Sequence, residues 1–183
     1  MTKTKTHTYA VQKSSNLDSW FRRMLQNPYK LLRPYINEGM TVLDLGCGTG
    51  YFSIPLSDLI GANGHVIAID TQQGMLAILE DKCRKNRVEN LTIKRNNAAS
   101  ISIQEKLDFA IAIYVMHELP NQKSFLQEVH RSLKKGGKLL IIEPNIIVSR
   151  KHFYMTIDCA LEIGFAIDKK PKVTFSKAIL LVK

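Results

Sequence analysis

The sequence has no apolar run close to the roughly 18 residues that a membrane-spanning helix requires. Its first residues include lysines but no apolar core segment, so they do not predict a secretory signal. Cysteine is also scarce: Cys47, Cys83 and Cys159 are an odd number and lack paired or metal-type spacing. These absences argue against a membrane protein, a disulfide framework and a cysteine-based metal site. We therefore expect a cytoplasmic protein without a bound metal ion.

Acidic residues are outnumbered, because 16 Asp and Glu stand against 26 Lys and Arg, for a formal net charge of +10. Such an excess is typical of proteins that bind nucleic acid or another anionic partner. It is also typical of a lysine-rich surface whose charge keeps the protein in solution. Composition alone leaves both interpretations open.

Length and composition fit one ordinary domain, since the chain has 183 residues, of which 45% are hydrophobic and 23% charged. Segments with strand patterns alternate with segments whose apolar residues recur at helical spacing. This alternation predicts an α/β fold built on a doubly wound, mostly parallel sheet. The connection between the last two strands is too short for a parallel crossover, so we expect an antiparallel last strand. The seven expected strands are 41–45, 65–69, 91–94, 107–115, 138–143, 165–168 and 174–182.

Helical spacing appears first in residues 16–36, where Pro28 breaks the pattern into two short helices. We interpret residues 1–38 as a helical arm that covers the site and residues 39–183 as the main domain. The pair Gly136-Gly137 is expected to end a later helix. The remaining expected helices are 51–59, 72–86, 121–134 and 152–163.

Three glycines, Gly46, Gly48 and Gly50, alternate in the stretch VLDLGCGTG directly after the first expected strand. The first strand–helix turn of a doubly wound sheet is the usual nucleotide site, because glycine lets the backbone approach a ligand closely. The dinucleotide spacing G-x-G-x-x-G is not met, since Tyr51 stands in place of the third glycine, and no P-loop G-K-[ST] follows. Asp44 ahead of the glycines is unfavourable beside a pyrophosphate but suits a ligand with ammonium and sulfonium groups.

A second acid, Asp70, ends the next expected strand in the stretch HVIAID, 20 residues after Gly50. A carboxylate there can accept hydrogen bonds from both hydroxyls of a ribose. It can also cap the helix that follows. The two roles are compatible, and the sequence leaves both open.

The stretch DLGCGTG, followed by an acid at the end of the second strand, resembles the class I S-adenosylmethionine-dependent methyltransferases. Within them the sequence is most similar to the small-molecule branch related to the ubiquinone and menaquinone biosynthesis methyltransferases. The resemblance spans roughly residues 39–183 and includes FAIAIYVMHELP, SLKKGGKLLIIEP and EIGF. It implies the Rossmann-like methyltransferase fold, S-adenosyl-L-methionine as cofactor, and transfer of its methyl group by in-line displacement to a small-molecule acceptor.

The resemblance also implies which residues bind the cofactor. The glycine turn and Asp44 would hold its methionine part together with the backbone carbonyl of Tyr114, and Asp70 would bind its ribose. The family usually places an Asp after the third strand to accept from the adenine amino group. Here Asn97 takes that position, and its amide carbonyl can accept the same bond. The cofactor-binding residues that the resemblance implies are Asp44, Gly46, Cys47, Gly48, Gly50, Asp70, Thr71, Met75, Asn97, Ala98 and Tyr114.

His117, in the stretch YVMHELP, follows the fourth expected strand and is the best candidate for a base that takes a proton from the acceptor. Its neighbour Glu118 could orient the ring or bind the acceptor. The alternative is that this pair only caps the next helix or packs the loop. Methyl transfer relies largely on positioning, so an obligatory catalytic side chain is not required.

Basic residues gather in the segments that we expect around the site, and a common rim would favour an anionic acceptor. The stretch YVMH differs from the NPPY-type tetrapeptide of DNA amino-methyltransferases, which argues against DNA as the acceptor. Two alternatives stay open: an RNA methyltransferase that uses this rim, and a catalytically idle partner subunit that only binds the cofactor. The basic residues are Lys13, Arg22, Arg23, Arg150, Lys151, Lys169, Lys170, Lys172 and Lys177.

Overall fold

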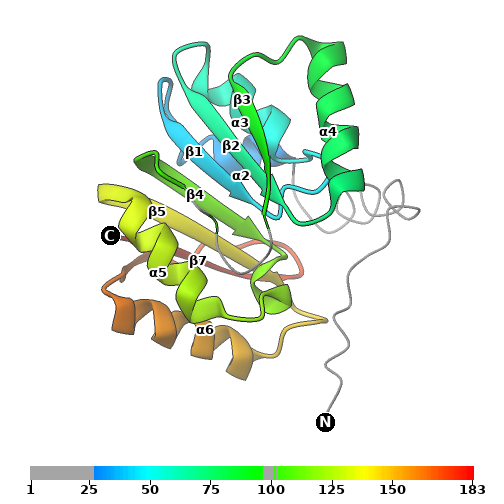
Figure 1. The fold of residues 1–183 in the computed structure, drawn as a ribbon. Coiled ribbons are helices and arrows are strands. Elements are labelled where there is room, and N and C mark those ends of the chain that lie inside the picture. The colour runs from blue at the N-terminus through cyan, green and yellow to red at the C-terminus, as the bar shows by residue number, and fades with distance from the viewer. Residues whose placement is uncertain (1–26, 97–100, 102) are drawn as a thin grey trace.

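The structure is a computed structural model that describes residues 27–96, 101 and 103–183. Its centre is one seven-stranded sheet in the order β3-β2-β1-β4-β5-β7-β6 (Figure 1). β7 runs antiparallel to β5 and β6, and the other neighbouring strands are parallel. The doubly wound sheet and its antiparallel last strand are thus confirmed. The strands are β1 (Thr41–Leu45), β2 (His65–Asp70), β3 (Leu91–Arg95), β4 (Leu107–Ile113), β5 (Leu133–Pro144), β6 (Ala166–Lys169) and β7 (Ser176–Val182).

Helices cover both faces of the sheet (Figure 1). Successive strand side chains point to opposite faces, so Val42 packs in one apolar cluster with Leu56 while Leu43 packs in another with Phe125. The first face carries α2, α3 and α4, and the second carries α5 and α6. The helices are α2 (Pro28–Leu32), α3 (Ser53–Ile60), α4 (Gln73–Asn86), α5 (Gln122–Ser132) and α6 (Arg150–Ile163).

The strand order reverses beside β1, which pairs with β2 on one side and with β4 on the other. In open parallel sheets, ligands bind at this reversal, outside the carboxyl ends of the strands. The glycine turn follows β1, Asp70 ends β2, and the 3-10 turn η2 (Met116–Glu118) follows β4. The fold therefore brings the predicted site residues that the structure describes to one edge of the sheet.

Several element boundaries differ from the sequence prediction; β5, for example, begins at Leu133 and not at residue 138. Two of these differences have a clear structural cause. β4 ends at Ile113 and not at residue 115, because Tyr114 has a left-handed backbone with φ of 59°. α5 ends at Ser132, before the glycine pair, because Leu133 is 1% exposed and pairs with Leu107 as the first residue of β5.

Of the expected N-terminal arm, residues 1–26 lie outside the described residues, and these include Lys13, Arg22 and Arg23. The described part packs into the core, where Leu31 and Leu32 are buried on the α3 face of the sheet. Across the described ranges, the structure contains no helix that is both long enough and apolar enough to cross a membrane.

Candidate active site

The glycine turn combines two glycines fixed by packing with one that faces open space. All three have positive φ, at 66° for Gly46, 53° for Gly48 and 83° for Gly50. A Cβ atom on Gly46 would lie 2.6 Å from Val115 Cγ2, and one on Gly50 would lie 2.2 Å from Leu79 Cδ1. A Cβ on Gly48 would meet nothing within 4 Å. The turn can therefore present the backbone of Gly48 closely to a ligand.

Asp70 connects the glycine turn to the start of α4 through two hydrogen bonds. Its Oδ2 accepts a hydrogen bond from the Gly48 backbone N–H at 2.9 Å, and its Oδ1 accepts one from the Gln72 N–H at 2.9 Å. Gln72 is itself the N-cap residue, so Asp70 supports the helix start from two residues before the cap. Its predicted role toward a ribose stays a prediction.

Asp44 lies beneath the turn with only 2% of its surface exposed, and its Oδ2 accepts a hydrogen bond from Ser53 Oγ at 2.6 Å. Burial raises the pKa of this carboxyl from 3.8 to about 7, against the lowering effect of the Ser53 hydrogen bond, and the charge of Asp70 adds to the rise. A cation placed near Asp44 would stabilise the ionised form. This property fits the predicted proximity to an ammonium group, which stays a prediction.

The predicted adenine-binding residues lie after β2 and β3. Met75 is 3% exposed in α4, and Thr71 is half-buried with its carbonyl accepting from Arg95 Nε at 3.2 Å. Asn97 and Ala98 lie outside the described residues. Cys47, in the turn, packs its side chain in an apolar cluster with Ala68. The contacts of all these residues with a cofactor stay predictions.

Asn96 is a residue that sequence reasoning missed. It directly follows β3, and its backbone N–H donates to the carbonyl of Asp70 at 3.1 Å. Its Oδ1 is buried and has no hydrogen-bond partner among the described residues. An unpaired buried acceptor costs free energy that a ligand donor can recover. Together with the open space at Gly48, this acceptor beside Asp70 fits the nucleoside part of S-adenosylmethionine.

Tyr114 connects the end of β4 to β7. Its backbone N–H donates to the carbonyl of Ile142 at 2.8 Å, and its hydroxyl shares a 2.5 Å hydrogen bond with Ser176 Oγ. A non-glycine residue at positive φ costs roughly 1–2 kcal/mol, and these two bonds together with burial hold it there. The predicted contact of its carbonyl with the methionine ammonium stays a prediction.

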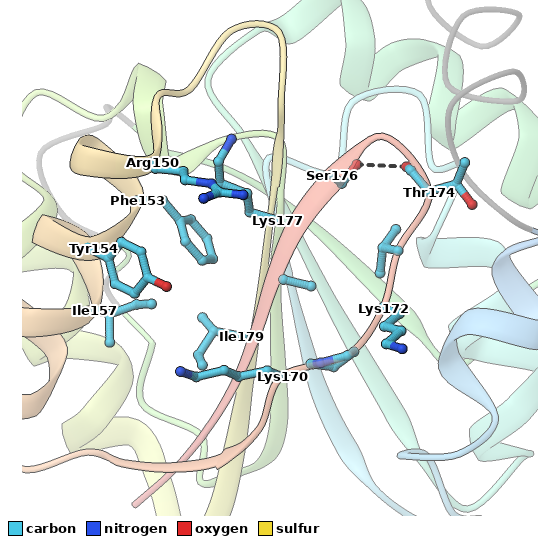
Figure 2. Close-up of a pocket in the computed structure, with 13 residues that line it drawn as sticks. Arg150, Phe153, Tyr154, Ile157, Lys170, Lys172, Thr174, Ser176, Lys177 and Ile179 are labelled. Carbon is cyan, nitrogen blue, oxygen red and sulfur yellow. Dashed lines mark hydrogen bonds between the residues drawn. The ribbon is translucent and has the colours of Figure 1, made fainter.

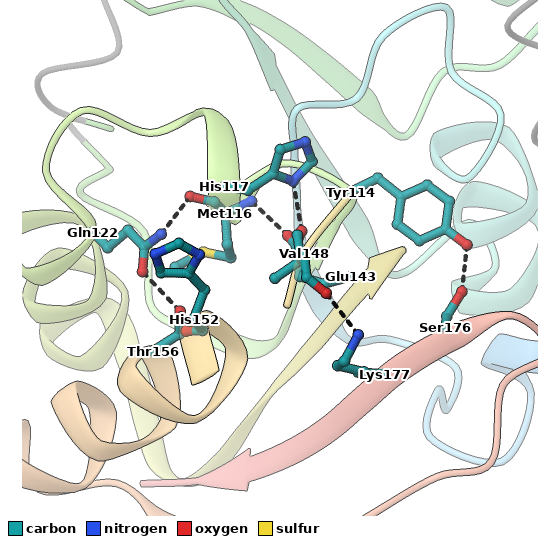
Figure 3. A network of polar contacts seen from close by, with 10 residues as sticks. All are labelled: Tyr114, Met116, His117, Gln122, Glu143, Val148, His152, Thr156, Ser176 and Lys177. Atoms are coloured by element: carbon teal, nitrogen blue, oxygen red, sulfur yellow. Dashed lines mark hydrogen bonds and ion pairs between the residues drawn. The ribbon is translucent and has the colours of Figure 1, made fainter. Parts of the chain in front are cut away.

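The candidate base His117 is held by Glu143, which lies near the end of β5 and which sequence reasoning also missed (Figure 3). Glu143 is 2% exposed. Its Oε2 lies 2.5 Å from His117 Nδ1, and its Oε1 accepts from the Met116 backbone N–H at 2.9 Å. The signal that could have found it is an acid at the end of a buried strand in LLIIEP, the same signal that identified Asp70.

Both predicted acceptor-facing residues, His117 and Glu118, have raised pKa values, but for different main causes. Burial lowers the pKa of His117, but the hydrogen bond and charge of Glu143, with the charge of Glu118, outweigh it and the net pKa is raised. Partial burial of the Glu118 carboxyl raises its pKa, His117 lowers it, and the charges of Asp70 and Glu143 raise it again. Glu118 as a whole residue is exposed although its carboxyl group is partly buried, and its role toward an acceptor stays a prediction.

This arrangement can perform proton abstraction. When Glu143 accepts a hydrogen bond from Nδ1–H, the neutral His117 ring has an unprotonated Nε2 that can accept a proton from a bound molecule. The Met116 N–H holds the second oxygen of Glu143, so the carboxylate cannot easily rotate away from the ring. His117 after β4 and Glu143 in β5 therefore form one hydrogen-bonded pair whose geometry is fixed.

The comparison with protein families matches residues 36–172 to the methyltransferase domain family. Among curated proteins, a demethylmenaquinone methyltransferase of Oceanobacillus iheyensis is 32% identical over 126 residues, 67% of this chain and 53% of that protein. Another of Lactococcus lactis is 32% identical over 106 residues, 57% of this chain and 42% of that protein. The chain thus spans about half the length of the curated relatives that it matches.

Solved structures share the fold over nearly the whole chain. The crystal structure of a SAM-dependent methyltransferase from Aquifex aeolicus superposes with a TM-score of 0.85 at 26% identity, over 96% of this chain and 99% of that one. TrmN from Thermus thermophilus superposes with a TM-score of 0.70 at 20% identity, over 85% of this chain and 48% of that one, and this likeness shows the fold alone. The chain belongs to the class I S-adenosylmethionine-dependent methyltransferases, whose cofactor is S-adenosyl-L-methionine.

Proposed function

We propose that this protein transfers the methyl group of S-adenosylmethionine to a small anionic acceptor, with His117 as the base. The observation that carries the proposal is the buried Glu143 carboxylate, which holds His117 at the carboxyl end of β4, close in the chain to Tyr114. A buried carboxylate–imidazole pair at the ligand-binding edge of a parallel sheet is suited to proton transfer.

The bound cofactor would supply a methyl group on a positively charged sulfur, which a nucleophile attacks in line. The protein holds the reactants together, and such positioning can lower a barrier by about 7–11 kcal/mol. Glu143 fixes the His117 tautomer with Nδ1 protonated. His117 Nε2 then takes the acceptor proton as the nucleophile attacks, a contribution of about 10²–10⁴-fold for general bases.

The charge of one groove supports an anionic acceptor. Four of the predicted basic residues, Arg150, Lys170, Lys172 and Lys177, line one groove near the carboxyl ends of the strands. The curated relatives are named for demethylmenaquinone, but the chain spans only about half of their length. We therefore take the acceptor class from the charge of the groove and not from those names.

The test is incubation of the protein with radiolabelled S-adenosylmethionine and a fractionated metabolite extract. We expect label in a small anionic product, and a rate about 10²–10⁴-fold lower for His117→Gln with unchanged cofactor affinity. The exposed His152, which has no proposed role, provides the control His152→Gln. Label in RNA would favour the RNA alternative, and no transfer to any fraction would favour an idle subunit.

A further inference from the structure

A groove of about 600 Å³ lies between α6 and β7 (Figure 2). Phe153, Tyr154 and Ile157 approach it from α6, and the floor includes Ile179 of β7. Residues 170–174, before β7, form the opposite wall. The groove therefore places apolar side chains of α6 and β7 among polar and basic ones.

The groove exists because β6 covers only part of β7. The register pairs β6 with Leu180, Leu181 and Val182 alone. Among the described residues, the first half of β7, from Ser176 to Ile179, has a strand partner only on the β5 side. This half-strand is therefore open at the edge of the sheet, and its neighbours form walls and not a further strand.

Four cations surround this apolar interior, and no Asp or Glu lines it among the described residues. Arg150 and Lys177 lie on one side in Figure 2, and Lys170 lies across from them. Within the described ranges, none of Arg150, Lys170, Lys172 and Lys177 pairs with a carboxylate. Lys177 Nζ donates instead to neutral oxygens, Asn145 Oδ1 at 3.0 Å and the Val148 carbonyl at 2.7 Å. No carboxylate in the described part of the chain thus compensates their positive charge.

The apolar lining makes a bare inorganic ion a poor match for the whole groove. Phe153, Ile157 and Ile179 are 6%, 3% and 1% exposed, so they form a closely packed floor that offers a ligand little further surface. Tyr154 is 53% exposed and presents its ring to the groove (Figure 2). A ligand that buries apolar surface there and places an anionic group among the cations would satisfy both parts of the lining.

We propose that this groove binds an amphipathic anion, a small molecule with a carboxylate or phosphate on an apolar body. Lys177 pairs in register with Glu143, and Ser176 shares a hydrogen bond with Tyr114, so the groove adjoins the candidate active site. The ligand is then the methyl acceptor, an identification that rests on the proposed function. The binding itself does not depend on methyl transfer.

The test is calorimetric titration of the full chain, without cofactor, with octanoate and octyl phosphate as probes and neutral octanol for comparison. We expect both anions to bind more tightly than octanol, with an affinity that falls as salt rises. Arg150→Glu should weaken anion binding by roughly fivefold or more, because it reverses a charge at the groove. Its neighbour Lys151, exposed on the same turn of α6 but not lining the groove, provides the matched control Lys151→Glu.

A second pair of variants, Tyr154→Ser with the control Met155→Ser, tests the apolar part of the groove lining. Tyr154→Ser should weaken binding of both anions, while Met155→Ser should not, because Met155 is 56% exposed but does not line the groove. Equal loss in each matched pair, equal binding of octanol, or competition by S-adenosylhomocysteine would overturn the proposal. Anion binding without methyl transfer would leave this groove in place and contradict only the proposed function.

Discussion

At the scale of single residues, three acids in β1, β2 and β5 lie in three different environments near the carboxyl ends of these strands. Asp44 is buried with a hydroxyl partner, Asp70 accepts from two backbone N–H groups, and Glu143 pairs with an imidazole. Burial of Asp44 favours a carboxyl that ionises near neutral pH, against the lowering effect of its Ser53 hydrogen bond on the pKa. The partners of Asp70 favour a carboxylate that shapes the turn, and the partner of Glu143 favours one that orients a base.

Glu143→Gln tests the orienting role. The amide keeps the volume, but its NH₂ group would donate to His117 Nδ1 and leave the ring proton on Nε2. We expect at least about a tenfold lower rate of methyl transfer, within the range for loss of general-base catalysis. In the native protein the rate should rise with pH through a midpoint above the ordinary histidine value, because the pKa of His117 is raised and only the neutral ring is a base.

In Glu143→Gln this midpoint should move to lower pH, because only the smaller effect of the Glu118 charge then opposes the lowering of the His117 pKa by burial. The measurement is the pH–rate profile of native and variant protein at saturating cofactor. A variant with a reduced rate but an unchanged midpoint would show that Glu143 supports only the fold.

Asp44→Asn tests the cost of the buried acid. The folded pKa of about 7 lies above the ordinary value of 3.8, so the fold favours the protonated form, and stability is lost as pH rises through this range. A neutral Asn avoids that loss. Thermal unfolding should therefore show a higher Tm for the variant at about pH 8 and a smaller difference at about pH 4.

Cofactor binding should respond in the opposite direction, because Asn cannot provide the negative charge that an ammonium group favours. Titration with S-adenosylhomocysteine at about pH 8 is expected to give weaker binding to Asp44→Asn than to the native chain. An equal Tm difference at both pH values would contradict the raised pKa, and tighter binding would contradict the proposed contact.

At the scale of elements, substitutions of Gly48 and Gly50 in the same turn should affect different properties, cofactor affinity at Gly48 and stability at Gly50. Both have positive φ, so alanine costs about 1–2 kcal/mol at either site. At Gly50 the new Cβ would also lie 2.2 Å from Leu79, which adds about 1–3 kcal/mol of overpacking. Denaturant unfolding should show the larger loss for Gly50→Ala.

Gly48→Ala should instead reduce cofactor affinity beyond its effect on stability, because its Cβ would occupy the open space above the turn. Titration with S-adenosylhomocysteine checks this expectation at a temperature where both variants are folded. Equal affinities for Gly48→Ala and native protein would remove the turn from the cofactor site.

Local pattern predicted the element order but not the element ends. The helical pattern extends to residue 134, yet Leu133 joins β5, because pairing with Leu107 depends on a strand far away in the sequence. The apolar run of β4 extends to Val115, yet Tyr114 adopts a left-handed backbone held by Ile142 and Ser176. Both exceptions are decided by tertiary contacts that periodicity does not contain.

The same limit applies to the candidate site. Its residues Asp44, Asp70 and His117 could be selected from sequence because each lies in or follows an apolar strand pattern. The pairing of His117 with Glu143 depends on how β4 and β5 assemble. The position of the Asn96 side-chain oxygen, which has no partner among the described residues, depends on how β2 and β3 assemble. Residue type predicts which side chains could take part in catalysis, but the fold determines which of these side chains contact one another.

At the scale of the whole molecule, the cations behind the net charge of +10 do not all carry the same information about a ligand site. Some cations pair with acids on the surface, such as Lys85 with Asp81 and Lys138 with Asp168. Others, in the groove beside β7, face no carboxylate in the described part of the chain. The fold thus concentrates uncompensated charge next to the carboxyl ends of the strands, where a methyl acceptor would approach.

The central claim is that the glycine turn and Asp70 bind S-adenosylmethionine and not a dinucleotide. The most direct measurement is calorimetric titration of native and Asp70→Ala protein with S-adenosylhomocysteine and with NAD. We predict binding of S-adenosylhomocysteine that weakens by about 1–3 kcal/mol in Asp70→Ala, and no binding of NAD. Tighter binding of NAD, or unchanged S-adenosylhomocysteine affinity in the variant, would contradict the account.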